Sequence, residues 1–226
     1  MRVKRQEMRR ERLSSWVNGR AARMLVHMGI REELKERPQI LVVCTGNICR
    51  SPMGAAVLRS KFASREIPLS VISAGVSNEE DGHPVYPPAV RVLHEHGYEV
   101  DEAHRAHRVS TAELENSGLI LAMTTGHARA VKRIAEAVGV PVERIHLWRE
   151  FDASGLEVAP AGAFGPGGVL SDDHVPRGRH SAHSDFYYSS GDWDVPDPWG
   201  GTNADFEATM AVVEKGATGI ADMLAE

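Results

Sequence analysis

The sequence has few cysteines and no long apolar run. Only Cys44 and Cys49 are present among 226 residues, and they fall in one short stretch. They cannot form a disulfide framework, and this usage is typical of a reducing compartment, so we expect a cytoplasmic protein. No run of about 18 apolar residues occurs, so no membrane span is predicted. The first residues are charged throughout and lack an apolar region, so no secretory signal is predicted.

The net charge of −5 is unevenly distributed. Residues 1–37 hold 11 Lys and Arg against 5 Asp and Glu, a net of +6, which leaves 15 basic and 26 acidic residues, a net of −11, for the rest. A basic arm on an acidic body predicts an anionic or protein partner for the arm, or else a solvated helical tail. The arm has a single Trp and a poor apolar stripe, so it indicates neither membrane-surface nor specific nucleic-acid binding.

Strands and helices are expected to alternate after the arm. Short apolar, partly β-branched runs predict strands at 39–43, 69–73, 119–122 and 144–147. Helical spacing of apolar residues predicts helices at 52–63, 87–97, 126–138 and 203–225. The alternation predicts an α/β fold, a doubly wound and mainly four-stranded parallel sheet with helices on both faces. Ligands of such sheets bind beyond the carboxyl ends of the strands.

We divide the chain into a basic helical N-terminal extension, residues 1–37, and a main domain, residues 38–226. The extension is expected to end at Pro38 and to lie outside the core. An insert at about 153–191, rich in Gly, Ser, Pro and His, has no periodic apolar face and predicts a solvated loop. Its possible ligands match no known metal-binding spacing, so no metal is predicted. They are His174, His180, His183, Asp172, Asp173 and Asp185.

The most informative stretch is Gln39–Pro52, QILVVCTGNICRSP. It predicts a strand, a short loop and a helix that starts with Ser51 as N-cap and Pro52 after it. Such a loop directs several backbone N–H groups at one point and binds anions, phosphate above all. At the end of the strand Cys44 is expected to favour its thiolate, and Arg50 can hold two phosphate oxygens. The pattern predicts nucleophilic phosphoryl transfer, the alternative being a buried structural cysteine.

The segment CTGNICRSP resembles the signature of the low-molecular-weight protein tyrosine phosphatases. The resemblance covers about residues 39–151 and 191–225 and implies the flavodoxin-like architecture of that family. It also implies a role for Cys49, a reversible disulfide with Cys44 under oxidation. Asn47 is expected to lie near Ser73 and support the loop, and Ser51 to donate to the thiolate of Cys44. The implied phosphate-binding loop consists of Thr45, Gly46, Asn47, Ile48, Cys49 and Ser51.

A second motif, DWDVPDPWGG, follows the insert. A thiolate that attacks a phosphomonoester needs a carboxylic acid to protonate the leaving group. The resemblance implies that Asp197 is this acid and afterwards the base that activates water. Trp199 would form one wall of a substrate slot by stacking. A plain Asp-Pro turn is the alternative.

The resemblance implies a phosphatase that hydrolyses phosphotyrosine in phosphorylated proteins through a cysteinyl-phosphate intermediate, without metal or cofactor. Alternatives are an arginine phosphatase on the same scaffold and a phosphoprotein-binding module without turnover. Arsenate reduction is disfavoured because it needs further cysteines. Ile48 stands where arginine phosphatases carry Thr and favours phosphotyrosine, whereas the acidic loop Glu79–Asp81 lacks an aromatic wall and suits a cationic side chain.

Overall fold

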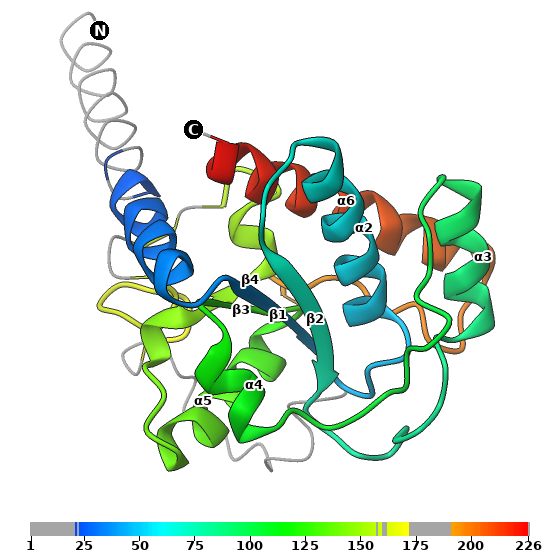
Figure 1. Ribbon diagram of the computed structural model, residues 1–226, viewed down its shortest axis with the longest axis horizontal. Helices are drawn as coiled ribbons and strands as arrows, with labels where there is room; N and C mark the ends of the chain where they lie inside the picture. The colour runs from blue at the N-terminus through cyan, green and yellow to red at the C-terminus, as the bar shows by residue number, and fades with distance from the viewer. Residues whose placement is uncertain (1–20, 22, 157, 160–161, 172–190, 226) are drawn as a thin grey trace, which may run out of the picture.

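The computed structural model describes residues 21, 23–156, 158–159, 162–171 and 191–225 (Figure 1). Its sheet is wholly parallel, in the order β2-β1-β3-β4, which confirms the predicted doubly wound sheet. The strands are β1 (Gln39–Cys44), β2 (Ser70–Gly75), β3 (Leu119–Ala122) and β4 (Ile145–Leu147). The helices are α2 (Arg50–Ser64), α3 (Pro87–Glu95), α4 (Thr111–Asn116), α5 (Thr125–Ala137) and α6 (Asn203–Ala225), with 3-10 turns η1 (Val142–Arg144) and η2 (Trp148–Glu150).

Helices cover both faces of the sheet: α2, α3 and α6 lie on one side and α4 and α5 on the other (Figure 1). Alternate residues of β1 serve the two layers, because successive side chains of a strand point to opposite faces. Ile40 and Val42 pack in the cluster that includes α2 and α6, and Leu41 and Val43 pack in the cluster that includes α5. Cys44 is the last residue of β1. The strand order reverses between β1 and β3, and ligands of such sheets bind at this point, beyond the carboxyl ends of the strands.

The sequence reasoning missed α4. Its start carries a capping box, in which the side chain of Ser110 accepts from the backbone of Glu113 and the Glu113 carboxylate accepts from the backbone of Ser110. This spacing of Ser and Glu was the available signal. Only Leu114 is buried in the helix, so the apolar pattern could not reveal it.

The helix after the loop, α2, begins at Arg50, whereas the sequence predicted that it begins after Ser51. Cys49 occupies the N-cap position of α2 and makes no side-chain cap hydrogen bond. The expectation that Ser51 caps this helix is therefore wrong. Its hydroxyl lies against the sulfur of Cys44 and the carbonyl of Ala74 instead, because the first turn of α2 is packed against the ends of β1 and β2.

The described part of the N-terminal arm packs on the main domain. Residues 23–36 are helical, and the helix ends before Pro38 as predicted. Ile30 and Leu34 are each 4% exposed and belong to the α2–α6 core cluster, so the expectation that the arm lies outside the core is wrong here. Arg31 also donates to the carbonyl of Met223 at 2.9 and 2.6 Å. The division of the chain at residue 37 stays a prediction.

We expect Leu34→Ala to lower the free energy of unfolding by about 2–5 kcal/mol, because it leaves a cavity in the core. Leu25, on the same helix, is 60% exposed and provides the matched control. Leu25→Ala should change the same quantity by less than about 0.5 kcal/mol. Urea unfolding of both variants measures the difference, and equal effects would show that the helix does not dock in solution.

The start of the insert is also packed. Ala163 and Leu170 are buried in the cluster that includes α5, so the expectation of a fully solvated loop is wrong for these residues. The histidines and aspartates considered as metal ligands lie outside the described residues. No helix in the described part of the chain is long and apolar enough to cross a membrane.

Candidate active site

The loop between β1 and α2 turns its carbonyl groups outward. All of its peptide bonds are trans, so each C=O and the N–H that follows it point in opposite directions. The amides that follow these carbonyls therefore face the centre of the loop, as predicted for an anion site. Four carbonyls accept bonds from the surrounding protein: Cys44 from Val76 at 2.9 Å, Thr45 from Ser77 at 3.1 Å, Asn47 from His104 at 2.9 Å and Ile48 from Tyr86 at 2.9 Å.

Asn47 links the loop to the sulfur of Cys44. Its φ of 58° lies in the left-handed region, which Asn tolerates better than most residues. Its Nδ2 donates to Ser51 Oγ at 3.0 Å and to Ser73 Oγ at 2.9 Å. Ser51 Oγ is 3.0 Å from Cys44 Sγ. The structure thus brings together four predicted residues, and the Ser51 hydroxyl is placed to donate to a thiolate at Cys44.

A pocket of about 120 Å³ opens above this loop. Its lining combines loop residues 44–46 and 48–50 with Glu79, Glu80, Asp197 and Trp199. Asn47, Ser51 and Ser73 are buried behind the lining. Of the predicted site, eight residues therefore face the pocket and three support it: Cys44, Thr45, Gly46, Ile48, Cys49, Arg50, Asp197 and Trp199, and then Asn47, Ser51 and Ser73.

Arg50 and Asp197 meet across the pocket. Arg50 Nη2 donates to Asp197 Oδ2 at 2.6 Å, with the guanidinium 3% exposed and the carboxylate 45% exposed. Arg50 Nη1 is buried and has no hydrogen-bond partner among the described residues. A buried cationic donor without a partner is costly, so an anion in the pocket that accepts from Nη1 would be favoured.

The segment that carries Asp197 is anchored by residues that the sequence reasoning missed. Asp194 accepts from the backbone N–H of Thr125 at 2.6 Å, at the start of α5. Val195 donates to the carbonyl of Met123 at 2.8 Å. In the turn itself, Trp199 N–H donates to Asp197 Oδ1 at 3.2 Å. The motif has three aspartates. Asp197 lines the pocket, as the resemblance implied, whereas Asp194 anchors the segment, which the resemblance did not indicate.

His127 is a second residue that the sequence reasoning missed. It is fully buried, its Nε2 is 2.8 Å from Thr45 Oγ1, and Thr45 Oγ1 also accepts from Arg50 Nη2 at 3.4 Å. Burial, and then the charge of Arg50, hold the pKa of His127 well below its ordinary value. The imidazole is therefore neutral and fixes Thr45 beside Arg50. The available signal was the segment LAMTTGH, residues 121–127, which is part of the stretch that resembles the low-molecular-weight protein tyrosine phosphatases.

Cys49 has the character of a protonated thiol. Both cysteines are free and buried. Burial raises the pKa of Cys49 far above its ordinary value, and the nearby Cys44 and Asp197 raise it further. Of the two sulfurs in the loop, Cys49 is thus a poor nucleophile at neutral pH.

The fold and the loop define a class of protein. A thiol at the carboxyl end of the first parallel strand, faced by converging amides and a buried guanidinium, is how cysteine-dependent phosphatases hold a phosphoryl group. The chain belongs to the low molecular weight phosphotyrosine protein phosphatase family, whose model matches residues 39–159.

Curated relatives support this assignment over most of the chain. A low molecular weight protein-tyrosine phosphatase A from Mycobacterium tuberculosis is 32% identical and is matched over 83% of this chain and 91% of its own. A low molecular weight protein-tyrosine-phosphatase from Streptomyces coelicolor is 31% identical over 80% and 90%. Among solved structures, YwlE arginine phosphatase from Geobacillus stearothermophilus is 27% identical with a TM-score of 0.56, over 81% of this chain and 90% of that one.

Proposed function

We propose that this enzyme hydrolyses phosphotyrosine in phosphorylated proteins through a cysteinyl-phosphate intermediate. The observation that carries the proposal is Cys44 Sγ, held 3.0 Å from Ser51 Oγ in a loop whose amides converge on the pocket. Arg50, with its unpartnered Nη1, lines the same pocket. The names of the Mycobacterium and Streptomyces relatives support phosphotyrosine as the substrate.

In the first step the Cys44 thiolate attacks phosphorus and the bond to the tyrosyl oxygen breaks. The loop amides and Arg50 hold the phosphoryl oxygens, and Asp197 gives its proton to the departing phenolate. The phosphoryl group would compete with Asp197 for the donors of Arg50, since the two pair at 2.6 Å in the free pocket. Phosphate binding would thereby release the Asp197 carboxyl to take its place beside the leaving group.

In the second step Asp197 takes a proton from water, and the resulting hydroxide attacks the cysteinyl phosphate. Inorganic phosphate leaves and Cys44 returns to its thiolate, to which Ser51 donates. Asn47 keeps the Ser51 hydroxyl in place, because its Nδ2 donates to both Ser51 Oγ and Ser73 Oγ.

The choice of substrate depends on the pocket wall. Ile48 lines the pocket with a branched apolar side chain that suits an aryl ring and offers no hydrogen bond to a guanidino group. The exposed Trp199 lies on the same pocket and can stack on the ring. Glu79 and Glu80 also line it and favour a cationic side chain, which is the observation in favour of phosphoarginine. Glu79 is exposed and therefore screened by solvent, and the carboxylate of Glu80, 28% exposed, already lies 2.7 Å from His83 Nδ1. We therefore expect Ile48 to decide.

We expect kcat/KM to be higher for phosphotyrosine peptides than for phosphoarginine peptides of matched sequence. In Ile48→Thr the ratio should move toward phosphoarginine by roughly 5–150-fold, since pairing a buried polar group contributes about 1–3 kcal/mol. Ile48→Val, which keeps the apolar surface, is the control. A wild-type preference for phosphoarginine would overturn the choice of substrate and leave the cysteine chemistry standing.

We also propose that Cys49 is the redox partner of Cys44. Peroxide converts the Cys44 thiolate to a sulfenic acid, and the protonated Cys49 thiol condenses with it, forming a disulfide and releasing water. Mild peroxide should inactivate the wild type reversibly, with a Cys44–Cys49 disulfide detected by mass spectrometry. In Cys49→Ser, recovery with reductant should fall, because Cys44 oxidises further. Equal recovery in both proteins would rule out the protective disulfide.

The cytoplasmic location and the partner of the arm remain proposals. The chain has only two cysteines, both in one loop, and this usage supports a reducing compartment. The net charge of +6 on residues 1–37 supports an anionic or protein partner. Co-sedimentation of the full chain with anionic and neutral vesicles, and with polyanions, would test the arm; no binding to any would leave it a solvated tail.

A further inference from the structure

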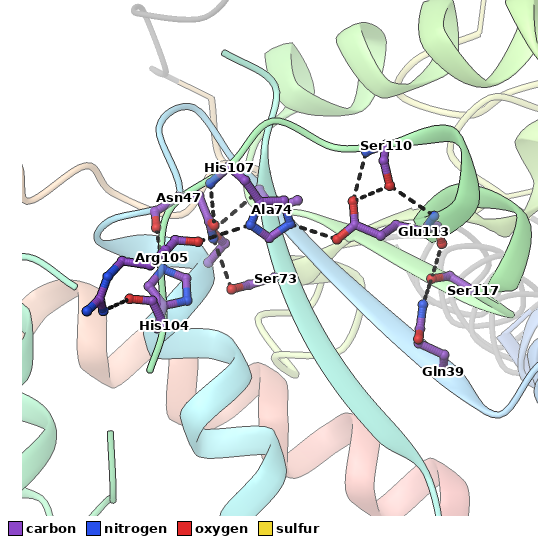
Figure 2. Close-up of polar contacts among 11 residues, drawn as sticks. Gln39, Asn47, Ser73, Ala74, His104, Arg105, His107, Ser110, Glu113 and Ser117 are labelled. Atoms are coloured by element: carbon purple, nitrogen blue, oxygen red, sulfur yellow. Dashed lines mark hydrogen bonds and ion pairs between the residues drawn. The ribbon is translucent and has the colours of Figure 1, made fainter. Parts of the chain in front are cut away.

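A polar network outside the pocket reaches Asn47 from α4. Figure 2 shows it running from Asn47 through His107 to Glu113. The backbone N–H of His107 donates to Asn47 Oδ1 at 3.3 Å, and its carbonyl accepts from Gly75 N–H, at the end of β2, at 2.8 Å. His107 thus joins the edge of the sheet to the residue that orients Ser51.

The ring of His107 is flanked by acceptors on both sides. Its Nδ1 lies 3.1 Å from the carbonyl of Arg105, and its Nε2 lies 2.7 Å from Glu113 Oε1. Neither a carbonyl nor a carboxylate can donate, so both contacts are hydrogen bonds only when each ring nitrogen carries a proton. The geometry therefore selects the imidazolium form, and a neutral ring loses one of its two bonds.

The charges around His107 favour that form. Glu113 faces it from α4, Asp81 from the loop after β2, and His104 from its own segment. Burial opposes protonation, but the bonds to Arg105 and Glu113 and the charges of Glu113 and Asp81 outweigh it, and the pKa of His107 is raised. Burial lowers the pKa of His104. As the pH rises above neutral, His107 is therefore the histidine of this network that loses its positive charge.

We propose that His107 is a positioning residue whose imidazolium form holds Asn47, and through Ser51 the sulfur of Cys44, in the geometry for attack. Loss of the proton breaks the hydrogen bond of the ring to Arg105 or to Glu113. The backbone of His107 then moves more freely, which weakens the hydrogen bond from its N–H to Asn47 Oδ1. Asn47 is in the left-handed region and relies on such side-chain bonds to keep its place. Small displacements of a nucleophile are costly to the rate.

The direction of the pH effect follows from the raised pKa. The positioning is complete below the ordinary value, near pH 6.5, and is lost as the pH rises through the raised value. This inference rests on the proposed role of Cys44, so the test needs one measurement that does not require turnover. Alkylation of Cys44 by iodoacetate reports directly on its thiolate.

The experiment compares wild type, His107→Gln and His107→Arg with the control His96→Gln. His96 also lies between two carboxylates, Glu207 at 2.9 Å and Glu214 at 3.3 Å, and its pKa is also raised, but it joins α3 to α6. The quantities to measure are kcat/KM for an aryl phosphate and the rate at which iodoacetate alkylates Cys44, both between about pH 5 and 9.

His107→Gln should lower kcat/KM by roughly 3–30-fold near neutral pH and shift the alkylation curve to higher pH. His107→Arg, a permanent cation, should restore neutral activity and remove the alkaline loss assigned to His107. His96→Gln should change neither curve. Glu113→Gln removes the carboxylate beside His107, so the fall in kcat/KM with rising pH should begin at a lower pH. This variant provides the test if His107→Gln fails to fold.

Unchanged alkylation and pH profiles in His107→Gln and Glu113→Gln would overturn the inference, as would equal changes in His96→Gln. Wild-type protein that lacks turnover but shows the expected alkylation shift would reject the proposed function and retain the positioning role. Turnover in wild-type protein, with an alkylation curve that does not shift in His107→Gln, would retain the proposed function and reject the positioning role.

Discussion

Cys44→Ser should abolish turnover and leave phosphate binding in place. In the proposed mechanism the sulfur accepts the phosphoryl group, and an alcohol of ordinary pKa cannot replace it. The rate should therefore fall by at least about 10²-fold. The substitution changes one buried atom, so the loop and Arg50 keep their geometry. Steady-state hydrolysis of an aryl phosphate measures the loss, and calorimetry with inorganic phosphate measures the binding.

Cys49→Ser is the matched control, because it makes the same sulfur-to-oxygen change in the same loop. The Cys49 thiol is also buried, and its raised pKa keeps it protonated. In the presence of reductant it should retain turnover within about tenfold of wild type, as expected for a residue that is not the nucleophile. Residual hydrolysis above about one per cent in Cys44→Ser would remove Cys44 from the nucleophile's role. Phosphate binding without turnover in wild-type protein would favour the binding-module alternative.

Asp197→Ala should lower kcat roughly 10²–10⁴-fold on substrates with poor leaving groups, the usual contribution of a general acid. The loss should be smaller for an activated aryl phosphate, whose leaving group needs little protonation. The substitution also removes the carboxylate paired with Arg50 at 2.6 Å. Inorganic phosphate should therefore inhibit the variant at lower concentrations than it inhibits wild type.

Asp192→Ala is a suitable control for this experiment. Asp192 is an exposed carboxylate in the same motif and does not line the pocket. It should keep the activity on both substrates and the phosphate inhibition of wild type. Equal losses on good and poor leaving groups in Asp197→Ala would mean that Asp197 holds the turn and does not transfer a proton.

The correct and incorrect predictions differ in how far apart the contributing residues lie. β3 and α6 have the predicted bounds, 119–122 and 203–225, because each has its own apolar pattern. The proposed phosphate-binding loop could be predicted as a unit because its candidate nucleophile, its amides and its cation lie within residues 44–51. By contrast, α4 buries only one residue, so its apolar pattern does not mark it. The local signal for this helix is the capping box at its start.

The sequence by itself determined the class of the fold, the identity of the loop and the acid candidate, since each is encoded in a short local pattern. Tertiary structure alone decided which distant groups support them. His127 is 82 residues from Thr45, His107 is 60 from Asn47, and Arg50 is 147 from the carboxylate it pairs with. It also decided that Ile30 and Leu34 complete the core. Such contacts depend on the order of the strands and the layering of helices, which no local pattern specifies.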